Sequence, residues 1–374
     1  MNNTNSSGRL VSLDALRGFT MFWIIGGGSL AAALSELSSN SLIQTLANQL
    51  EHVKWEGFRF YDLIFPMFVF IVGVSTAFSV PRAIDEKGKK NTIKKIIIRA
   101  LSLYLIGLVY YGWSPTETDG DQLRYVGVLQ RIAICYLACG LLFCFLNLRG
   151  LLVTLFVLLI GYWALMSFVP TPGLEKVTFE KGENLANWFD GKYLPGFKWS
   201  GTYDPEGLLS TFPAIASCLI GVLVGILFKN ENKSHAEKLK WVFFLGVLLI
   251  ITGSLWSLHF PVIKNLWTSS YVLVAGGCSM IFLGAFYYLI DIKKWKNWSK
   301  IFVWIGMNSI TIYLAWKFFR FKDISNNIIG EPVQKFIDEI SFDHMGNLII
   351  SMLSLSLAVL FCRFLYKNKI FLRL

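Results

Sequence analysis

Long apolar runs alternate with short polar segments along the whole of this 374-residue chain. A helix of about 20 apolar residues crosses the hydrocarbon core of a bilayer. About ten runs approach or exceed that length, at 13–34, 60–80, 96–113, 125–147, 150–169, 206–228, 240–259, 269–290, 300–318 and 347–366. The pattern predicts an all-α, polytopic helical membrane protein with about ten transmembrane helices.

The first apolar run has a competing interpretation as a cleaved signal peptide, because Ala31-Ala32-Ala33 resembles a small-residue cleavage site. Asp14 and Arg17 lie near its start, and a charged region ahead of it is almost absent, which is atypical of signal peptides. We therefore interpret it as a retained first span. A broken helix within residues 26–50 is an alternative to a single continuous span.

Composition supports the membrane class, with 54% hydrophobic and only 16% charged residues, where soluble domains carry about 25% charged residues. We expect one transmembrane domain over residues 1–374. The longest segments outside the spans, 170–205 and 319–346, are expected to be extracytoplasmic loops. The first is either an ordered external loop or a lid over a binding surface.

The distribution of charge predicts the orientation, because cytoplasmic loops of membrane proteins are rich in Lys and Arg. With both termini on one side, that side holds 22 Lys and Arg against 6 Asp and Glu, and the other side holds 13 against 18. Both termini are therefore expected in the cytoplasm. We attribute the net charge of +11 to the orientation of the chain in the lipid bilayer. We therefore expect no nucleic-acid partner.

A histidine and an acid flank the start of the second span. His52 lies just outside the apolar run and Asp62 slightly inside it. Charged groups at such depth are costly and are commonly functional, and a neutral imidazole can accept a proton near pH 7. The alternative is an interfacial histidine that only anchors the span.

Other polar residues lie inside or beside spans. Asp14 and Arg17 are three residues apart and share a helix face near the cytoplasmic end, where a local ion pair is the alternative to a functional role. Gln130 and Arg131 lie in the fourth span at a depth similar to that of Asp62, and we predict an Arg131–Asp62 pair between helices.

The ninth span carries Asn308 near the middle of the membrane, where an interhelical hydrogen bond competes with a role at the site. Gly221 and Gly225 are spaced for close helix packing. We find no P-loop, no dinucleotide fingerprint and no metal-ligand spacing, so no metal is expected.

Short motifs recur in order from about residue 9 to 314. They are Arg9-Leu-Val-Ser-Leu-Asp14-Ala-Leu-Arg17-Gly18 with Gly26-Gly-Gly28, His52-x-x-Trp55-x-Gly57, Asp62-Leu-Ile-Phe-Pro66, Gly127-Val-Leu-Gln130-Arg131, Tyr203-Asp-Pro-Glu-Gly207, Pro261 to Tyr271, and Gly306-Met-Asn308-Ser309. In these motifs and their order, the chain resembles the heparan-α-glucosaminide N-acetyltransferase family of transmembrane acetyltransferases.

The resemblance implies that an acetyl group passes from cytoplasmic acetyl-CoA to the amine of a glucosamine-type sugar on the far side of the membrane. It implies that His52 is catalytic, either as a general base or as an acetyl-imidazole intermediate. Trp55, Asp62, Gln130, Arg131 and Asn308 would support it. Arg17 and Asp14, with the basic 87–99 loop, are our candidates for the contacts to acetyl-CoA.

This sequence also departs from the family. It has only about a dozen residues ahead of the first span, and Trp23-Ile24-Ile25 stands where the family has an asparagine before the glycines. The short form resembles a bacterial inner-membrane member. A transporter of a sugar or anionic solute on the same scaffold is the alternative function, and a homodimer is left open.

Overall fold

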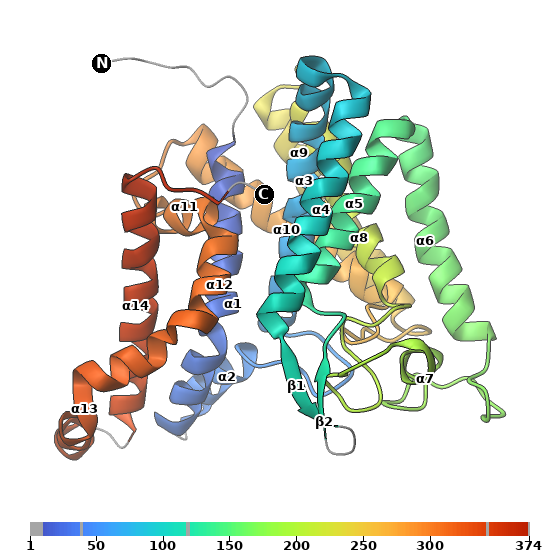
Figure 1. Ribbon diagram of the computed structural model, residues 1–374. Coiled ribbons are helices and arrows are strands. Elements are labelled where there is room, and N and C mark those ends of the chain that lie inside the picture. Colours follow the sequence, from blue (N-terminus) through green and yellow to red (C-terminus); the bar gives the residue numbers. More distant parts are fainter. Residues whose placement is uncertain (1–9, 38–39, 117–119, 342–343, 373–374) are drawn as a thin grey trace, which may run out of the picture. The chain divides into compact units, whose positions relative to one another are not determined.

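The computed structural model describes residues 10–37, 40–116, 120–341 and 344–372, with the side chains of 113–121 also excepted. Its contacts divide the chain into two compact units. The single transmembrane domain expected from the sequence stays a prediction. The first unit holds residues up to 54, then 58–68 and those from 282 onward, and the second unit holds 55–57 and 69–281. Figure 1 labels the elements of both.

The second unit is a bundle of long helices. Most of α3 (Phe60–Lys87) and of α10 (Ser269–Phe286) belongs to it. The other elements are α4 (Lys89–Tyr111), β1 (Trp113–Thr116), β2 (Gly120–Leu123), α5 (Val128–Phe145), α6 (Leu148–Phe168), α7 (Leu185–Tyr193), α8 (Thr211–Lys229) and α9 (His235–Trp256). The strands form an antiparallel hairpin in which Trp113 pairs with Leu123.

Local signals separate these helices. Gly88 has a φ of +77°, a conformation that favours glycine, and it divides α3 from α4. Asn147 caps α6 by accepting a hydrogen bond from the Gly150 amide. Ser234 and Glu237 form a reciprocal capping box at the start of α9. These short connections produce antiparallel neighbours.

Glycines bring the helices of the second unit into backbone contact. A Cβ at Gly221 of α8 would collide with the carbonyl of Phe70 in α3, and one at Gly225 would lie 2.6 Å from the Ala77 Cβ. The predicted role of this glycine pair in helix packing is confirmed. Close packing makes α3 the most buried of the candidate spans.

The first unit contains α1 (Val11–Leu37), α2 (Ser41–Gln49), the start of α3, the π-helix η1 (Tyr287–Ile292), α11 (Lys300–Met307), α12 (Ser309–Phe319), α13 (Phe321–Ile340) and α14 (Met345–Lys367). Helices α1 and α11 cross at two glycines, because a Cβ on Gly18 would meet the Phe302 carbonyl and one on Gly306 would meet the Asp14 carbonyl. The glycines of two sequence motifs therefore serve this crossing.

Most of the membrane spans predicted from the sequence correspond to long apolar helices in the structure. Within the described residues, eight helices are long and apolar enough to cross a membrane. The predicted ninth span is instead two helices, α11 and α12, bent by 81° at Asn308. Helix α4 covers most of the predicted 96–113 span, but the Lys and Arg residues in its first half make it too charged to count among these eight helices. The protein is thus a polytopic helical membrane protein.

The two segments predicted as loops contain helices of their own. Within 170–205 lies α7, and residues 319–346 are largely the helix α13, which is interrupted at Gly330. The stretch at 26–50 holds the end of α1 and the separate helix α2. Within the described residues, the membrane segment with a sharp break is the one that contains Asn308.

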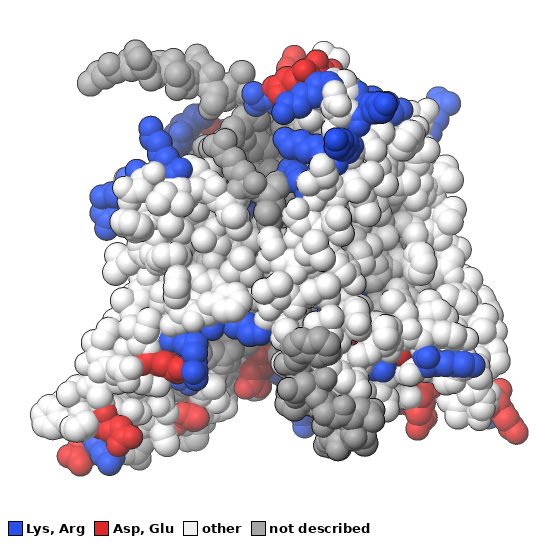
Figure 2. All heavy atoms as spheres, viewed as in Figure 1, with Lys and Arg blue, Asp and Glu red and all other residues white. Residues whose placement is uncertain are grey.

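Basic residues gather at the end of the second unit where α3 meets α4, as Figure 2 shows in blue. The exposed ones there are Arg82, Lys87, Lys89, Lys90, Lys94 and Lys95. Asp85 and Glu86 accompany them, and Arg82 pairs with Glu86 at 2.7 Å. The density of positive charge at this end agrees with the pattern on which the sequence-based orientation rests.

Candidate active site

His52 and Asp62 form a hydrogen-bonded pair in the first unit, the His52–Asp62 pair. Nδ1 of His52 lies 2.8 Å from Oδ1 of Asp62. The Asp62 side chain is fully buried, whereas that of His52 is 51% exposed. A carboxylate on Nδ1 favours the neutral tautomer with its proton on Nδ1, so that Nε2 carries the lone pair. The pair therefore presents a proton acceptor on an accessible ring.

The beginning of α3 fixes the carboxylate of this pair. Asp62 lies in the first turn of α3, and its Oδ2 accepts hydrogen bonds from the amides of Arg59, at 3.1 Å, and Val53, at 3.3 Å. An acid in the first turn also interacts favourably with the helix dipole. Asp62 thus caps its own helix with one oxygen and orients His52 with the other.

Tyr61 forms one wall beside the histidine. Its ring lies 4.6 Å from that of His52, tilted by 31°. The same ring also contacts α1, where Gly27 lies so close that a Cβ would be 2.5 Å from the Tyr61 ring. The glycine run of the first span therefore allows α1 to pack against the residues that surround His52.

Trp55, three residues after His52, is anchored in the second unit. Its indole Nε1 donates to the Phe179 carbonyl at 2.8 Å, and its ring meets Tyr203 edge-on at 6.1 Å. The next two residues are held by the segment before α10, since the Gly57 amide donates to the Val262 carbonyl at 2.9 Å. The motif tryptophan is a structural anchor in these contacts.

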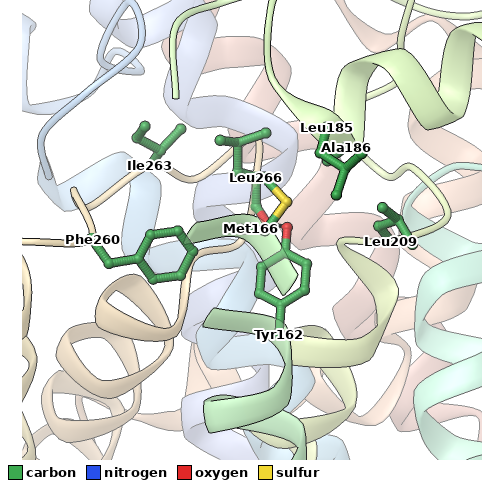
Figure 3. Close-up of a cluster of buried hydrophobic side chains, with 8 residues drawn as sticks. All are labelled: Tyr162, Met166, Leu185, Ala186, Leu209, Phe260, Ile263 and Leu266. Atoms are coloured by element: carbon green, nitrogen blue, oxygen red, sulfur yellow. Dashed lines mark hydrogen bonds between the residues drawn. The ribbon is translucent and has the colours of Figure 1, made fainter. Parts of the chain in front are cut away.

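Trp55 packs against a cluster of buried apolar side chains. Figure 3 shows the cluster itself. It joins α6, α7 and the segments before α8 and before α10, and its members are Tyr162, Met166, Leu185, Ala186, Leu209, Phe260, Ile263 and Leu266. The Tyr162 hydroxyl donates to the Leu266 carbonyl at 2.7 Å. The 170–205 segment is therefore packed onto the bundle.

Gln130 and Arg131 are both buried at the start of α5 in the second unit. Arg131 donates from Nη2 to the Gly207 carbonyl at 3.2 Å and to the Ser210 hydroxyl, and its guanidinium lies 4.9 Å from the centre of the Trp267 ring. These partners of Arg131 all belong to the second unit, whereas Asp62 belongs to the first. The predicted Arg131–Asp62 pair is therefore untested and stays a prediction.

A charged network that sequence reasoning missed holds the Tyr203–Gly207 motif. Arg124 donates to both carboxylate oxygens of Asp204, at 2.9 and 2.7 Å, and to Glu206 at 2.8 Å. Burial alone would lower the pKa of Arg124, but these two carboxylates hold it above its ordinary value. The partners are 80 residues apart in sequence, so no local pattern announces the pairing.

Asp190 of α7 contacts the same motif. It accepts hydrogen bonds from the amides of Leu208, at 2.9 Å, and Asp204, at 3.4 Å. Burial nevertheless raises the pKa of Asp190 to about 6. Burial, together with the charge of Asp204, also raises the pKa of Glu206. This part of the second unit therefore contains two carboxyl groups whose pKa values are raised, and that of Asp190 reaches about 6.

Three other predicted residues, Asp14, Arg17 and Asn308, lie in the first unit. Arg17 Nη1 and Asp14 Oδ1 are 3.3 Å apart, so the two residues share a helix face and form the local ion pair that the sequence left as the alternative to a functional role. Asn308 is buried at the bend between α11 and α12, and its Nδ2 donates to the Trp304 carbonyl of the preceding turn at 3.3 Å. This side-chain hydrogen bond lies within the same membrane segment, whereas the sequence suggested a hydrogen bond between two helices.

The arrangement around His52 suits removal of a proton. A half-exposed imidazole is held by a buried carboxylate, as in general bases that assist nucleophilic attack on carbonyl compounds. Within the described residues, no three His, Cys, Asp or Glu side chains gather as ligands for a metal ion. The sequence identified both residues of the pair but assigned Asp62 to another partner.

Comparison with known proteins agrees with this chemistry. A family model described as an acyltransferase domain matches residues 10–367, nearly the whole chain. The chain therefore belongs to this family of acyltransferases, as a polytopic membrane member.

Two curated relatives bear the same name, heparan-alpha-glucosaminide N-acetyltransferase. The protein from Mus musculus is 27% identical over 380 residues, which cover 86% of this chain and 56% of the relative. The protein from Homo sapiens is 26% identical over 424 residues, which cover 97% of this chain and 59% of the relative. The chain thus spans less than two thirds of the length of either.

Proposed function

We propose that this chain is a transmembrane N-acetyltransferase that moves an acetyl group from cytoplasmic acetyl-CoA to the amine of a glucosamine-type sugar. The acceptor lies on the extracytoplasmic side of a bacterial inner membrane, and both termini lie in the cytoplasm. The single observation that carries the proposal is the His52–Asp62 pair in a chain of the acyltransferase family. The names of the two curated relatives support the donor and the acceptor class.

In the proposed reaction, the neutral amine of the sugar attacks the carbonyl carbon of the thioester. His52 Nε2 takes the proton that the amine nitrogen loses as the N–C bond forms. The C–S bond then breaks, and CoA leaves as a thiolate that is protonated by the imidazolium or by solvent. Asp62 stabilises the imidazolium and keeps the imidazole in the required tautomer.

A covalent route uses the same residues. His52 Nε2 itself would attack the thioester, form an acetyl-imidazole and release CoA, and the amine would then take the acetyl group. The covalent route predicts acetylated His52 after incubation with acetyl-CoA alone. The direct route predicts unmodified His52 under that condition.

The donor would approach from the cytoplasmic side. CoA carries a 3′-phosphate and a pyrophosphate, which bind to Lys and Arg side chains. The exposed lysines where α3 meets α4 supply such groups, and Arg17 lies in the first half of α1. We assign Arg17, with Asp14 as its partner, and the 87–99 segment to acetyl-CoA binding as part of this proposal.

One observation favours a transporter as the second candidate. The bent pair α11 and α12 interrupts a membrane segment at a buried asparagine, and interrupted helices form substrate sites in many transporters. The acyltransferase family match, however, covers both units, and a half-exposed imidazole held by a buried carboxylate is a common arrangement for a general base. These points favour the enzyme.

Two measurements on the purified protein in detergent test the proposal. Acetyl-CoA should raise the melting temperature, by a shift that grows with its concentration. Acetyl transfer should then be detected with at least one member of a panel containing glucosamine, galactosamine and muramic acid, with N-acetylglucosamine as the matched control that has no free amine. A protein that acetyl-CoA does not stabilise, and that acetylates none of these amines, contradicts the proposal.

A further inference from the structure

Trp23 lies on the face of α1 that meets the beginning of α3. Its ring packs edge-on against Phe60, with the ring centres 5.4 Å apart. Gly27, one turn later on the same face of α1, lies against Tyr61. The Tyr61 ring in turn is 4.6 Å from that of His52. Trp23 and His52 therefore contact neighbouring residues in the first turn of α3.

The indole N–H of Trp23 has no hydrogen-bond partner within the described part of the chain, and its nitrogen is buried. An indole nitrogen can only donate. Buried tryptophan N–H groups usually have an acceptor, because an unpaired buried donor destabilises the fold. A buried donor that packs against Phe60, in the same helical turn as Asp62, is suited to an acceptor atom on a bound substrate.

The surroundings of this N–H are aromatic. Besides Phe60, the Trp23 ring meets Phe22 at 5.4 Å and Phe19 at 6.2 Å, both edge-on. Such an apolar surrounding has a low local dielectric, in which a fixed N–H dipole interacts strongly with negative charge that develops on an oxygen atom. The site therefore favours an oxyanion over a neutral carbonyl.

We propose that Trp23 is a catalytic residue whose Nε1–H donates a hydrogen bond to the carbonyl oxygen of the acyl thioester. This inference rests on the proposed function. As the amine nitrogen bonds to the carbonyl carbon, the electron pair of the C=O bond moves to oxygen, and Trp23 stabilises that oxyanion. The pair returns as the C–S bond breaks and CoA leaves as a thiolate, while His52 accepts the proton of the amine.

Trp163 of α6 provides a matched control. Its indole nitrogen is also buried without a hydrogen-bond partner among the described residues. Its ring, however, packs against Phe168, Trp256 and His259 in the second unit. The same substitution at Trp163 removes the same kind of N–H away from the proposed chemistry.

The first test replaces Trp23 by Phe and measures acetyl transfer to the amino sugar that the wild type uses best. Loss of one oxyanion donor should lower kcat roughly 10²-fold, with little change in the KM for the amino sugar. Trp163→Phe should leave kcat within about twofold of wild type. A second variant carries 3-benzothienylalanine at position 23, which keeps the shape of indole but lacks the N–H, so the test survives if Trp23→Phe does not fold.

The second test separates a hydrogen bond from a packing role. Acetyl-CoA has the thioester carbonyl, whereas S-ethyl-CoA lacks it. Removing the N–H should weaken acetyl-CoA binding by about 2- to 10-fold and leave S-ethyl-CoA binding unchanged. Equal weakening of both ligands, or a position-23 variant with wild-type kcat, overturns the role of Trp23. A wild-type protein that acetylates no amine contradicts the proposed function instead, and the ligand comparison then still tests the carbonyl contact.

Discussion

Asp62→Asn is the most informative single change near His52. The substitution keeps the size of the side chain and removes its charge. Asp62 is fully buried, and its two oxygens together accept from His52 Nδ1 and from the amides of Val53 and Arg59. An asparagine supplies one oxygen for these donors and can instead offer its NH₂ group to Nδ1. That arrangement would move the imidazole proton to Nε2 and remove the base.

The expected loss follows from the geometry. An imidazolium and a carboxylate with charges about 4 Å apart attract by about 4 kcal/mol at an effective dielectric constant of 20. His52 is half-exposed, so solvent screening reduces this to about 2 kcal/mol. At about 1.4 kcal/mol for each tenfold change, loss of the carboxylate lowers kcat by about 30-fold. Adoption of the wrong tautomer would extend the loss towards about 10⁴-fold, as for the same change in a Ser-His-Asp triad.

The assay compares kcat and melting temperature of purified Asp62→Asn with those of the wild type. Asp338→Asn is the matched control, because the Asp338 carboxylate also accepts a backbone amide in the first unit, that of Gly346 at 2.7 Å. The control should retain kcat. A well-folded Asp62→Asn protein with kcat within threefold of wild type would refute the role assigned to this carboxylate.

Further predictions concern stability and topology. Arg124→Leu leaves the buried Asp204 carboxylate without its partner, so the free energy of unfolding should fall by about 3–5 kcal/mol, measured by denaturation in detergent; a loss below about 1 kcal/mol would contradict a stabilising network. The folded-state pKa of Asp190 is about 6, above its unfolded value near 4, so the folded state binds more protons and stability should fall as pH rises from about 4 to 6. Asp190→Asn should flatten this decline, and an unchanged pH dependence of the melting temperature would refute the assignment. On a cysteine-free background, cysteine probes at Lys89 and Lys181 should be labelled from opposite sides of the membrane; labelling of both from one side contradicts the proposed topology.

Most of the fold was predictable because a membrane span reveals itself by local composition. Helices α5, α6, α8 and α9 lie close to the expected apolar runs. The bend at Asn308 was not predictable in this way, since an apolar run has the same hydropathy whether its backbone continues or turns. Hydropathy also cannot distinguish α4, whose charged first half extends beyond the apolar part, from a longer span.

The candidate site was only partly predictable, for a different physical reason. His52 and Asp62 were both identified from their polarity beside a span. Their pairing depends on how the chain turns before α3, where the amides of Val53 and Arg59 fix the carboxylate. Contacts across long sequence separations, such as that of Arg124 with Asp204, leave no periodic signal in a single chain.

Acetyl transfer by His52→Ala tests the central claim most directly. Wild-type protein and the variant would be purified in detergent and given radiolabelled acetyl-CoA and glucosamine, with melting temperature measured on the same samples. A base at His52 predicts that the variant melts like the wild type and loses about 10²–10⁴-fold in kcat. A His52→Ala protein that melts like the wild type and turns over at the wild-type rate would contradict the account.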